Sequence, residues 1–217
     1  MNCCSRQCQG IEAFFDDKVA QRELRSYQKR GPRKTTRLLL DAVRTRLRGK
    51  GRLLDIGGGI GAIQHELVPT TLAHATSVDA SPAYLAAAQQ EATRRGYAEH
   101  TTYIAGNFVD VAETVDLAHV VTLDRVICCF DDVDALVQQS AAKAEHLYAL
   151  VFPRDHWLNR LMFPLINLIS RLQRADFRIF LHPSQHVESL LADAGFERCF
   201  LEKTLLWQVR VFQRRVA

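Results

Sequence analysis

The feature that most constrains the fold is a regular alternation of short apolar runs with amphipathic segments. The apolar runs predict strands at 52–56, 74–79, 101–105, 117–123, 146–152, 197–203 and 205–213. Segments with helical spacing lie between them, near 60–68, 82–95, 131–144, 155–173 and 184–194. Such alternation is typical of a mostly parallel sheet covered by helices on both faces. The last two predicted strands are too close in sequence for a crossover helix, so we expect them to form an antiparallel hairpin.

Two further helical segments precede the first strand. They cover about residues 11–30 and 34–48, with Gly31 and Pro32 at the break between them. A chain of 217 residues with 47% hydrophobic residues has the size and composition of one α/β domain with one substantial core. We therefore predict a single domain over residues 1–217, with residues 1–48 as a helical cap and residues 153–183 inserted as a lid.

The sequence argues against secretion and against a membrane span. Its first residues lack the apolar core of a signal peptide, and no run approaches the ~18–20 apolar residues that cross a bilayer. A cytoplasmic location is therefore expected. There, the six cysteines are expected to be thiols or metal ligands and not a disulfide scaffold.

The positive charge is unevenly distributed. The formal net charge is +4, yet thirteen Lys and Arg residues stand against two acids, Glu23 and Asp41, within residues 18–52. Such a cluster attracts an anionic substrate, a nucleic acid or a membrane surface. The alternative is that these side chains form the solvated faces of two helices.

The strongest local signal is the run LLDIGGGIG, which lies directly between the first predicted strand and a helix. Gly57, Gly59 and Gly61 allow a sharp turn and a close approach of the backbone to a ligand, with N–H groups at a helix N-terminus. In the G-x-G-x-x-G loop of dinucleotide-binding folds the third glycine comes later. This spacing therefore favours a different nucleoside ligand.

Two acids accompany the glycines at strand ends. Asp55 precedes the glycine loop, and Asp79 ends the next apolar run, eighteen residues after Gly61. An ionised carboxylate at the second place accepts hydrogen bonds from both hydroxyls of a ribose.

In these motifs the chain resembles the class I S-adenosylmethionine-dependent methyltransferases. The matching segments are LLDIGGGIGA, SVDASPAYL and AGNF, and the resemblance extends over about residues 50–152. It implies a Rossmann-like, doubly wound sheet of seven strands in the order 3-2-1-4-5-7-6, which accounts for the antiparallel C-terminal hairpin. It also implies S-adenosyl-L-methionine (SAM) as the cofactor.

The resemblance assigns cofactor contacts residue by residue. The loop would pass close to the methionine portion, Asp55 would orient the amino group and Asp79 would hold the ribose. Asn107 would bind the adenine amino group, although the family often has an acid there; a turn-stabilising Asn is the alternative. The full set of implied cofactor contacts is Asp55, Gly57, Gly58, Gly59, Gly61, Asp79, Ala80, Asn107, Phe108 and Leu123.

The acceptor side is read from residues 120–132, which in the small-molecule branch of the family face the substrate. The segment is also similar to that of magnesium-protoporphyrin and ubiquinone-type methyltransferases, but Cys128 stands where those show a histidine. Cys128 and Tyr27 are the candidate catalytic residues. For Cys128 and Cys129 the first interpretation is small apolar residues in the pocket wall; the alternatives are thiolates that bind a soft metal or take part in the transfer, and redox sensors. Tyr27 is either a hydrogen-bond donor in the pocket or a helix-packing residue.

We predict methyl transfer from SAM to an O, N, C or S centre of a small molecule. No DNA partner and no metal site are predicted, and a homodimer is left open. One alternative is an RNA methyltransferase that uses the basic 18–52 region. The other is a cysteine-based metal- or metalloid-binding protein, or a metalloid or thiol methyltransferase, in which Cys3, Cys4 and Cys8 join the thiols of the pocket.

Overall fold

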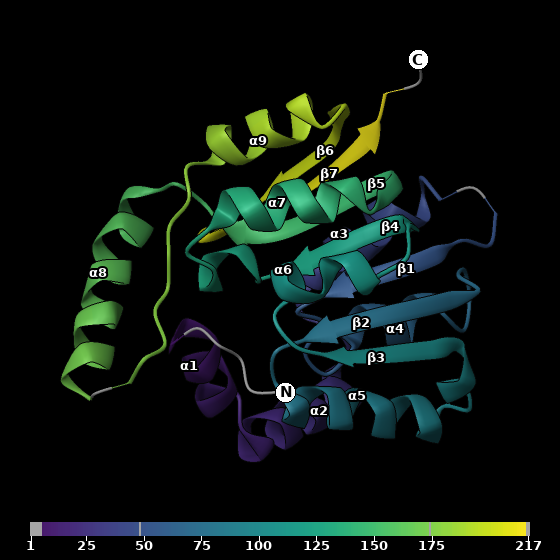
Figure 1. Ribbon diagram of the computed structural model, residues 1–217, viewed down its shortest axis with the longest axis horizontal. Coiled ribbons are helices and arrows are strands. Elements are labelled where there is room, and N and C mark those ends of the chain that lie inside the picture. The colour runs from purple at the N-terminus through teal and green to yellow at the C-terminus, as the bar shows by residue number, and fades with distance from the viewer. Residues whose placement is uncertain (1–5, 48, 174, 216–217) are drawn as a thin grey trace.

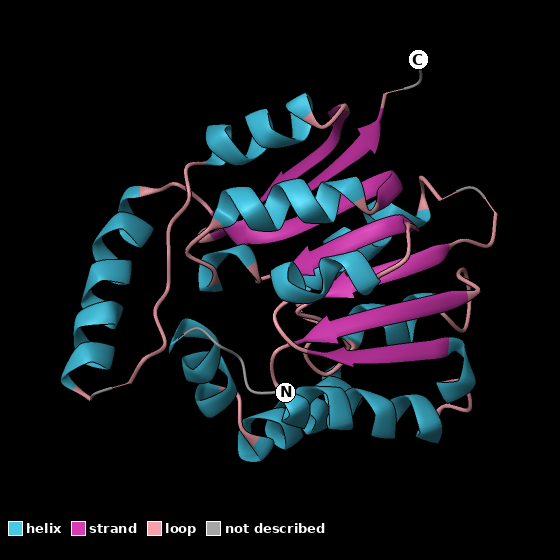
Figure 2. Ribbon diagram, viewed as in Figure 1, coloured by secondary structure: helices cyan, strands magenta, loops and turns pink. Residues whose placement is uncertain are grey.

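The strands form one seven-stranded sheet. The computed structural model describes residues 6–47, 49–173 and 175–215. The strand order is β3-β2-β1-β4-β5-β7-β6, with β1 to β5 parallel and β7 antiparallel to both of its neighbours (Figures 1 and 2). This order confirms the predicted Rossmann-like fold with its antiparallel C-terminal hairpin. The strands are β1 (Arg52–Ile56), β2 (His74–Asp79), β3 (Thr101–Ala105), β4 (Ala118–Asp124), β5 (Ala144–Pro153), β6 (Phe196–Lys203) and β7 (Trp207–Arg214).

The helices lie on both faces of the sheet and beyond its edge. They are α1 (Arg6–Phe14), α2 (Asp17–Arg30), α3 (Lys34–Arg44), α4 (Ala62–Leu67), α5 (Pro82–Arg94), α6 (Phe108–Val111), α7 (Val133–Ala142), α8 (Trp157–Leu172) and α9 (Ser184–Asp193). Three short 3-10 turns join them, η1 (Ala98–His100), η2 (Ala112–Thr114) and η3 (Ile127–Cys129). None of the helices in the described part of the chain is long and apolar enough to cross a membrane.

The N-terminal segment differs from the sequence prediction. The helical pattern over about residues 11–30 is divided between α1 and α2. The Asp16 side chain accepts a hydrogen bond from the Val19 backbone N–H at 2.9 Å and so begins α2 as its N-cap. The chain therefore turns at Asp16, which lets α1 lie apart from α2 beside the carboxyl ends of the strands (Figure 1).

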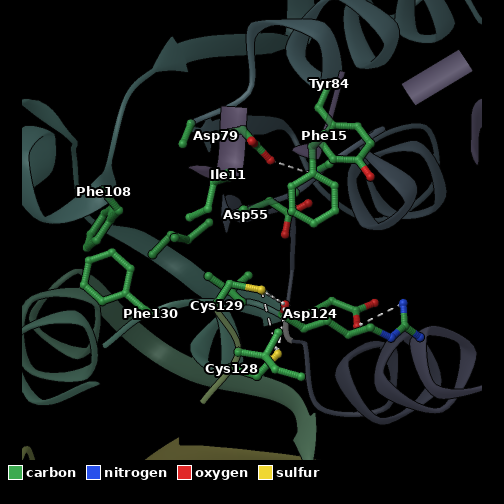
Figure 3. Close-up of a pocket in the computed structure, with 18 of the residues that line it drawn as sticks. Ile11, Phe15, Asp55, Asp79, Tyr84, Phe108, Asp124, Cys128, Cys129 and Phe130 are labelled. Atoms are coloured by element: carbon green, nitrogen blue, oxygen red, sulfur yellow. Dashed lines mark hydrogen bonds and ion pairs between the residues drawn. The ribbon is translucent and has the colours of Figure 1, made fainter. Parts of the chain in front are cut away.

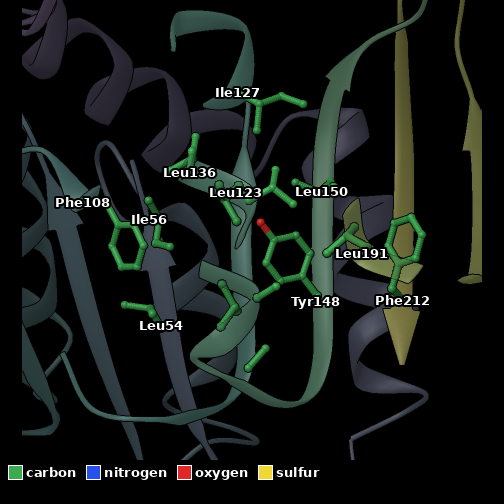
Figure 4. Packing of buried hydrophobic residues seen from close by; sticks show 14 of the residues in the cluster. Leu54, Ile56, Phe108, Leu123, Ile127, Leu136, Tyr148, Leu150, Leu191 and Phe212 are labelled. Atoms are coloured by element: carbon green, nitrogen blue, oxygen red, sulfur yellow. The ribbon is translucent and has the colours of Figure 1, made fainter. Parts of the chain in front are cut away.

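The core lies on both faces of the sheet because successive residues of a strand point to opposite sides. In β5, Tyr148 and Leu150 pack against α7 and α9 (Figure 4). Leu147 and Ala149 belong to the cluster on the other face, with α3 and α4. Burial on both faces explains why this strand appears in the sequence as a nearly continuous apolar run.

The strand order has one switch point, next to β1, where the order changes direction. From β1 the strand order runs through β2 to β3 on one side and through β4 to β5 on the other. In such sheets ligands bind beyond the carboxyl ends of the strands at this switch point. In Figure 1 the carboxyl ends of β2 and β4 point toward α1 and α8, which lie beyond the carboxyl ends of the strands.

Candidate active site

A pocket of about 670 Å³ opens at the carboxyl ends of β1, β2 and β4 (Figure 3). Its volume lies within the range of ~300–1,000 Å³ that is common for small-molecule sites. Most of the predicted site residues line it, namely Tyr27, Asp55, Gly57, Gly58, Gly59, Asp79, Ala80, Asn107, Phe108 and Cys128. The structure thus brings residues from five separate segments of the chain to one place.

Gly61 and Leu123 lie behind the pocket wall. Gly61 is the N-cap of α4 in the left-handed conformation, with φ 77°, and its N–H donates to the Gly58 carbonyl at 2.9 Å. Leu123 is fully buried in the hydrophobic cluster that Figure 4 shows. Gly61 therefore shapes the loop, and the Leu123 side chain belongs to the core.

The glycine loop is packed against two other parts of the site. Gly57 has φ 60°, and a Cβ there would lie 2.6 Å from Val126 Cγ2, just after β4. A Cβ on Gly58 would lie 2.6 Å from Asp55 Oδ2. The loop therefore needs glycine at both places, for conformation and space at Gly57 and for space at Gly58.

Asp55 has a buried carboxylate, and one of its oxygens has no hydrogen-bond partner among the described residues. Its side chain is fully buried, and Oδ1 accepts a hydrogen bond from Thr122 Oγ1 at 2.6 Å. No described residue donates a hydrogen bond to Oδ2. Burial raises the pKa of this carboxyl to about 7, and the charges of Asp124 and Asp79 add to the effect. An unpartnered buried oxygen is costly, and a cationic donor would satisfy it.

Asp79 is held rigidly at the end of β2. Its Oδ2 accepts from the Gly59 backbone N–H at 2.9 Å and its Oδ1 from the Ser81 N–H at 2.8 Å. Burial raises the pKa of this carboxyl to about 6. Each oxygen keeps a further lone pair for a ligand hydroxyl.

Asn107 has a local structural role as well as a place on the pocket wall. Its side-chain oxygen accepts from the Val109 N–H at 3.3 Å as the N-cap of α6. Its amide donates to Asp110 Oδ2, also at 3.3 Å. The turn-stabilising alternative thus describes one of its functions. Phe108 is buried and lies close to Phe130 on the same wall (Figure 3).

Asp124 is a pocket residue that the sequence analysis did not single out as a site residue. It ends β4, and its Oδ2 accepts from Thr36 Oγ1 at 2.5 Å. The next residue, Arg125, has φ 66°, the one positive φ of a non-glycine residue in the described ranges. Its guanidinium donates to Thr35 Oγ1 at 2.6 Å and pairs with Asp124 Oδ1 at 3.7 Å. An acid at the end of the fourth strand was the signal available in the sequence.

The two adjacent cysteines lie on the pocket wall as thiols. Their sulfur atoms are 3.9 Å apart, and the Cys128 thiol lies 3.5 Å from the Arg125 carbonyl oxygen. The hydrogen bond with Cys129 and burial both raise the pKa of Cys128 well above its usual range. Among the described residues no group of three or more His, Cys, Asp or Glu side chains could hold a metal ion. Cys3 and Cys4 lie outside the described residues, and Cys8 is in α1.

Tyr27 lines the pocket from α2, but its hydroxyl is engaged elsewhere. It donates a hydrogen bond to Glu66 Oε1 at 2.7 Å. Burial and the Glu66 carboxylate both raise the pKa of this phenol. The Arg95 guanidinium lies 5.1 Å from the ring centroid. These contacts give Tyr27 a firm place in the packing of α2.

The basic region between residues 18 and 52 is partly neutralised within the chain. Arg33 pairs with Glu23 at 2.7 Å, and Arg44 pairs with Glu66 at 3.6 Å. Arg46 donates to the Cys199 carbonyl oxygen at 3.1 Å. These contacts tie Arg33, Arg44 and Arg46 to other parts of the chain.

Comparisons with known proteins agree with this geometry. Residues 54–142 match the model of a methyltransferase domain family. No curated protein sequence matches the chain.

Solved structures share the fold. The magnesium protoporphyrin IX methyltransferase from Synechocystis PCC 6803 with bound SAM has a TM-score of 0.71 at 15% identity, covering 99% of this chain and 100% of that one. A putative sarcosine dimethylglycine methyltransferase from Galdieria sulphuraria has a TM-score of 0.68 at 12% identity, covering 83% of this chain and 85% of that one. A [4+2]-cyclase, SpnF, has a TM-score of 0.63 at 14% identity and covers 84% and 82%. One fold thus hosts different reactions, and the chemistry has to be argued from the site.

Proposed function

We propose that this chain is a class I SAM-dependent methyltransferase and that it transfers the methyl group to an O, N, C or S atom of a small molecule held in the pocket. The observation that carries the proposal is the pair Asp55 and Asp79 around the glycine loop, with one buried carboxylate oxygen unpartnered. This pair faces a pocket whose lining is mainly apolar.

The residues at the strand ends fit the cofactor. Asp55 Oδ2 would accept from its ammonium group, and the Asp79 carboxylate would accept from its ribose hydroxyls. Asn107 and Phe108 would contact the adenine from the pocket wall. When bound, SAM supplies an electrophilic methyl group on a sulfonium centre. The carboxylates of Asp55, Asp79 and Asp124 all line the pocket, and their negative charge favours a cationic ligand.

The remaining pocket residues would position the acceptor and exclude water. Met162, Phe163 and Ile166 line the pocket from α8, which supports the proposal that residues 153–183 are a lid. Alignment of the reacting atoms supplies much of the rate in such a displacement, and a base is needed only if the acceptor carries a proton. We propose Asp124, which ends β4 in the pocket wall, for that task. We keep Cys128 as the proposed thiol beside the acceptor and Tyr27 as a positioning residue.

The N-terminal helices would complete the enclosure as the proposed cap, within one domain over residues 1–217. Ile11 and Phe15 line the pocket from α1 and the turn after it. Phe14 stacks on Phe177 with ring centroids 4.7 Å apart, so α1 rests on the segment that follows α8.

We expect Gly10→Ala to open this enclosure. A Cβ on Gly10 would lie 2.5 Å from Phe177 N and 2.7 Å from the Asp176 carbonyl carbon, and backbone atoms cannot move aside cheaply. The affinity for SAM should fall by roughly 10-fold, although alanine alone favours the helix by about 1 kcal/mol. Calorimetric titration measures the effect, with Ala13→Ser on the exposed side of α1 as control. Unchanged affinity for Gly10→Ala would show that α1 does not close the pocket.

Cofactor binding is expected to release protons near pH 6.5. Burial raises the pKa of Asp55 to about 7 and of Asp79 to about 6, and a cation binds the ionised forms. Affinity should therefore rise between about pH 6 and 8. The stability of the free protein depends on pH in the opposite direction. Because the folded-state pKa values of Asp55 and Asp79 are both raised, the contribution of the two carboxyls to the free energy of unfolding is present below about pH 4 and is lost toward pH 7. Calorimetry in buffers of different ionisation enthalpy counts the protons. The Asp55→Asn variant should release fewer protons than the unchanged protein on binding SAM. Equal proton release by the two proteins would contradict the assignment of Asp55 to the cofactor site.

The acceptor is identified by incubating the protein with labelled SAM and host-cell extract, followed by mass spectrometry of the labelled product. A labelled small molecule that is absent with Asp79→Ala supports the proposal. Label on RNA, with binding that weakens steeply with salt, would favour the RNA alternative instead. Cofactor binding without any labelled product would overturn methyl transfer as the function.

A further inference from the structure

Helix α8 has two apolar faces, and only one of them lines the pocket. Met162 and Ile166 project into the pocket from its inner side, together with Asn159 and Phe163. A helix that only covered a pocket would carry polar residues on its other side. The outward side of α8 therefore calls for a partner of its own.

The outward face is a continuous apolar stripe. Its residues recur at i, i+4, i+8, i+11 and i+15, which at about 100° per residue keeps them within one narrow sector of the helix. All of them are between 52% and 76% exposed, namely Trp157, Leu161, Leu165, Leu168 and Leu172. Monomeric soluble proteins rarely expose so many large apolar side chains side by side, and such a patch marks an interaction site.

The helix is firmly attached to the acceptor side of the pocket. The Asn167 amide donates to the Ile179 carbonyl at 2.8 Å, and its oxygen accepts from the Ile179 N–H at 2.9 Å. The Phe180 N–H in turn donates to the Cys128 carbonyl at 2.7 Å. In Figure 1 the segment between α8 and α9 runs between α8 and the sheet, and α8 stands at the margin of the molecule. The exposed stripe thus belongs to an ordered element.

The charges on α8 identify its partner. The helix carries two cations, Arg160 and Arg171, and no acid; Arg160 pairs with Asp155, just before the helix, at 2.7 Å, and Arg171 lies at the other end. Arg160 directly precedes Leu161 and Arg171 directly precedes Leu172, so both arginines lie along the same side of the stripe. An apolar stripe flanked by arginines, with a tryptophan at one end, is the pattern of a helix that lies in the surface of an anionic bilayer.

We propose that α8 docks its outward face on an anionic lipid bilayer and that the methyl acceptor is a lipophilic molecule that reaches the pocket from this bilayer along the same helix. The bilayer contact depends only on the outward stripe. The acceptor class rests on the proposed function, because it requires methyl transfer in the pocket that the inner face of α8 lines.

The test combines vesicle binding with product analysis. The full chain is sedimented with vesicles of phosphatidylcholine and with vesicles that contain about 30% phosphatidylglycerol. The variant Leu161→Gln, Leu165→Gln, Leu172→Gln changes only exposed side chains, and Leu117→Gln, at a leucine 48% exposed on the far side of the sheet from α8, is the matched control. Affinity of each protein for SAM is measured by calorimetry. Labelled product is then sought in the membrane and aqueous fractions of host-cell extract.

We expect binding to the anionic vesicles that falls by about 100-fold in the triple variant and is unchanged in the control, with equal SAM affinity in all three. Labelled product should lie in the membrane fraction and diminish with the triple variant. Absence of vesicle binding, or equal binding by the triple variant, would overturn the docking. A dimer in sedimentation equilibrium that the triple variant abolishes, without vesicle binding, would assign the stripe to a second copy. Labelled product only in the aqueous fraction would overturn the acceptor class, whereas vesicle binding without any product would overturn the proposed function alone.

Discussion

Replacement of Asp79 by alanine is expected to abolish measurable SAM binding while the chain remains folded. The carboxylate is held by the Gly59 and Ser81 N–H groups, so it both fixes the glycine loop and offers acceptors for two ribose hydroxyls. Loss of such a buried contact costs about 2–4 kcal/mol, or about 30- to 1,000-fold in affinity. The loop would lose its tie to β2 in addition, which places the effect at the upper end. Calorimetric titration with SAM measures it.

Two variants separate the ribose contact from general effects of charge. Asp116→Ala removes an exposed acid away from the pocket and should leave the affinity unchanged. Asp79→Asn keeps the shape but loses one acceptor and the negative charge, so an intermediate loss is expected. Unchanged affinity in a folded Asp79→Ala protein would remove Asp79 from the cofactor site.

The positions of the central strands could be predicted because most residues of β1, β2, β4 and β5 are buried. The bounds of β1, β2 and β3 agree with the apolar runs 52–56, 74–79 and 101–105. Polar residues and glycines interrupt these runs where the chain leaves the sheet, so the pattern itself gives the limits. The break at Asp16 was missed because an acid within an amphipathic helix looks like an ordinary surface residue. Only its hydrogen bond to Val19 identifies it as a cap.

The cofactor side of the site was predictable for a related reason. Asp55, the glycines and Asp79 directly follow the strands that position them, so their places follow from the topology. The acceptor side depends on contacts between distant segments. Asp124 meets Thr36 across 88 residues, and Tyr27 meets Glu66 across 39. Periodicity assigns a residue to a face of a helix but does not say what that face meets, so the sequence could not show that one apolar face of α8 lines the pocket while the other is exposed.

Gly57→Ala is expected to damage folding and cofactor binding together. Gly57 has φ 60°, a conformation that costs other residues about 1–2 kcal/mol. Its N–H also donates to the Val78 carbonyl at 2.7 Å, which ties the loop to β2. A Cβ would in addition lie 2.6 Å from Val126 Cγ2. Relief of that contact must move either the glycine loop or the segment after β4 that carries Cys128.

Gly96→Ala is the matched control for Gly57→Ala, because Gly96 has a similar φ of 77° but no atom within 4 Å of the added Cβ. Both variants place an alanine in the left-handed backbone conformation. Both should therefore lose about 1–2 kcal/mol in the free energy of unfolding, measured with denaturant. Gly57→Ala should lose about 1–3 kcal/mol more from overpacking, and at least about 30-fold in SAM affinity, whereas Gly96→Ala should bind normally. Equal stability and equal affinity of the two variants would mean that the loop relaxes without cost. The close packing of glycine loop and acceptor segment could not then be what holds the two halves of the pocket in register.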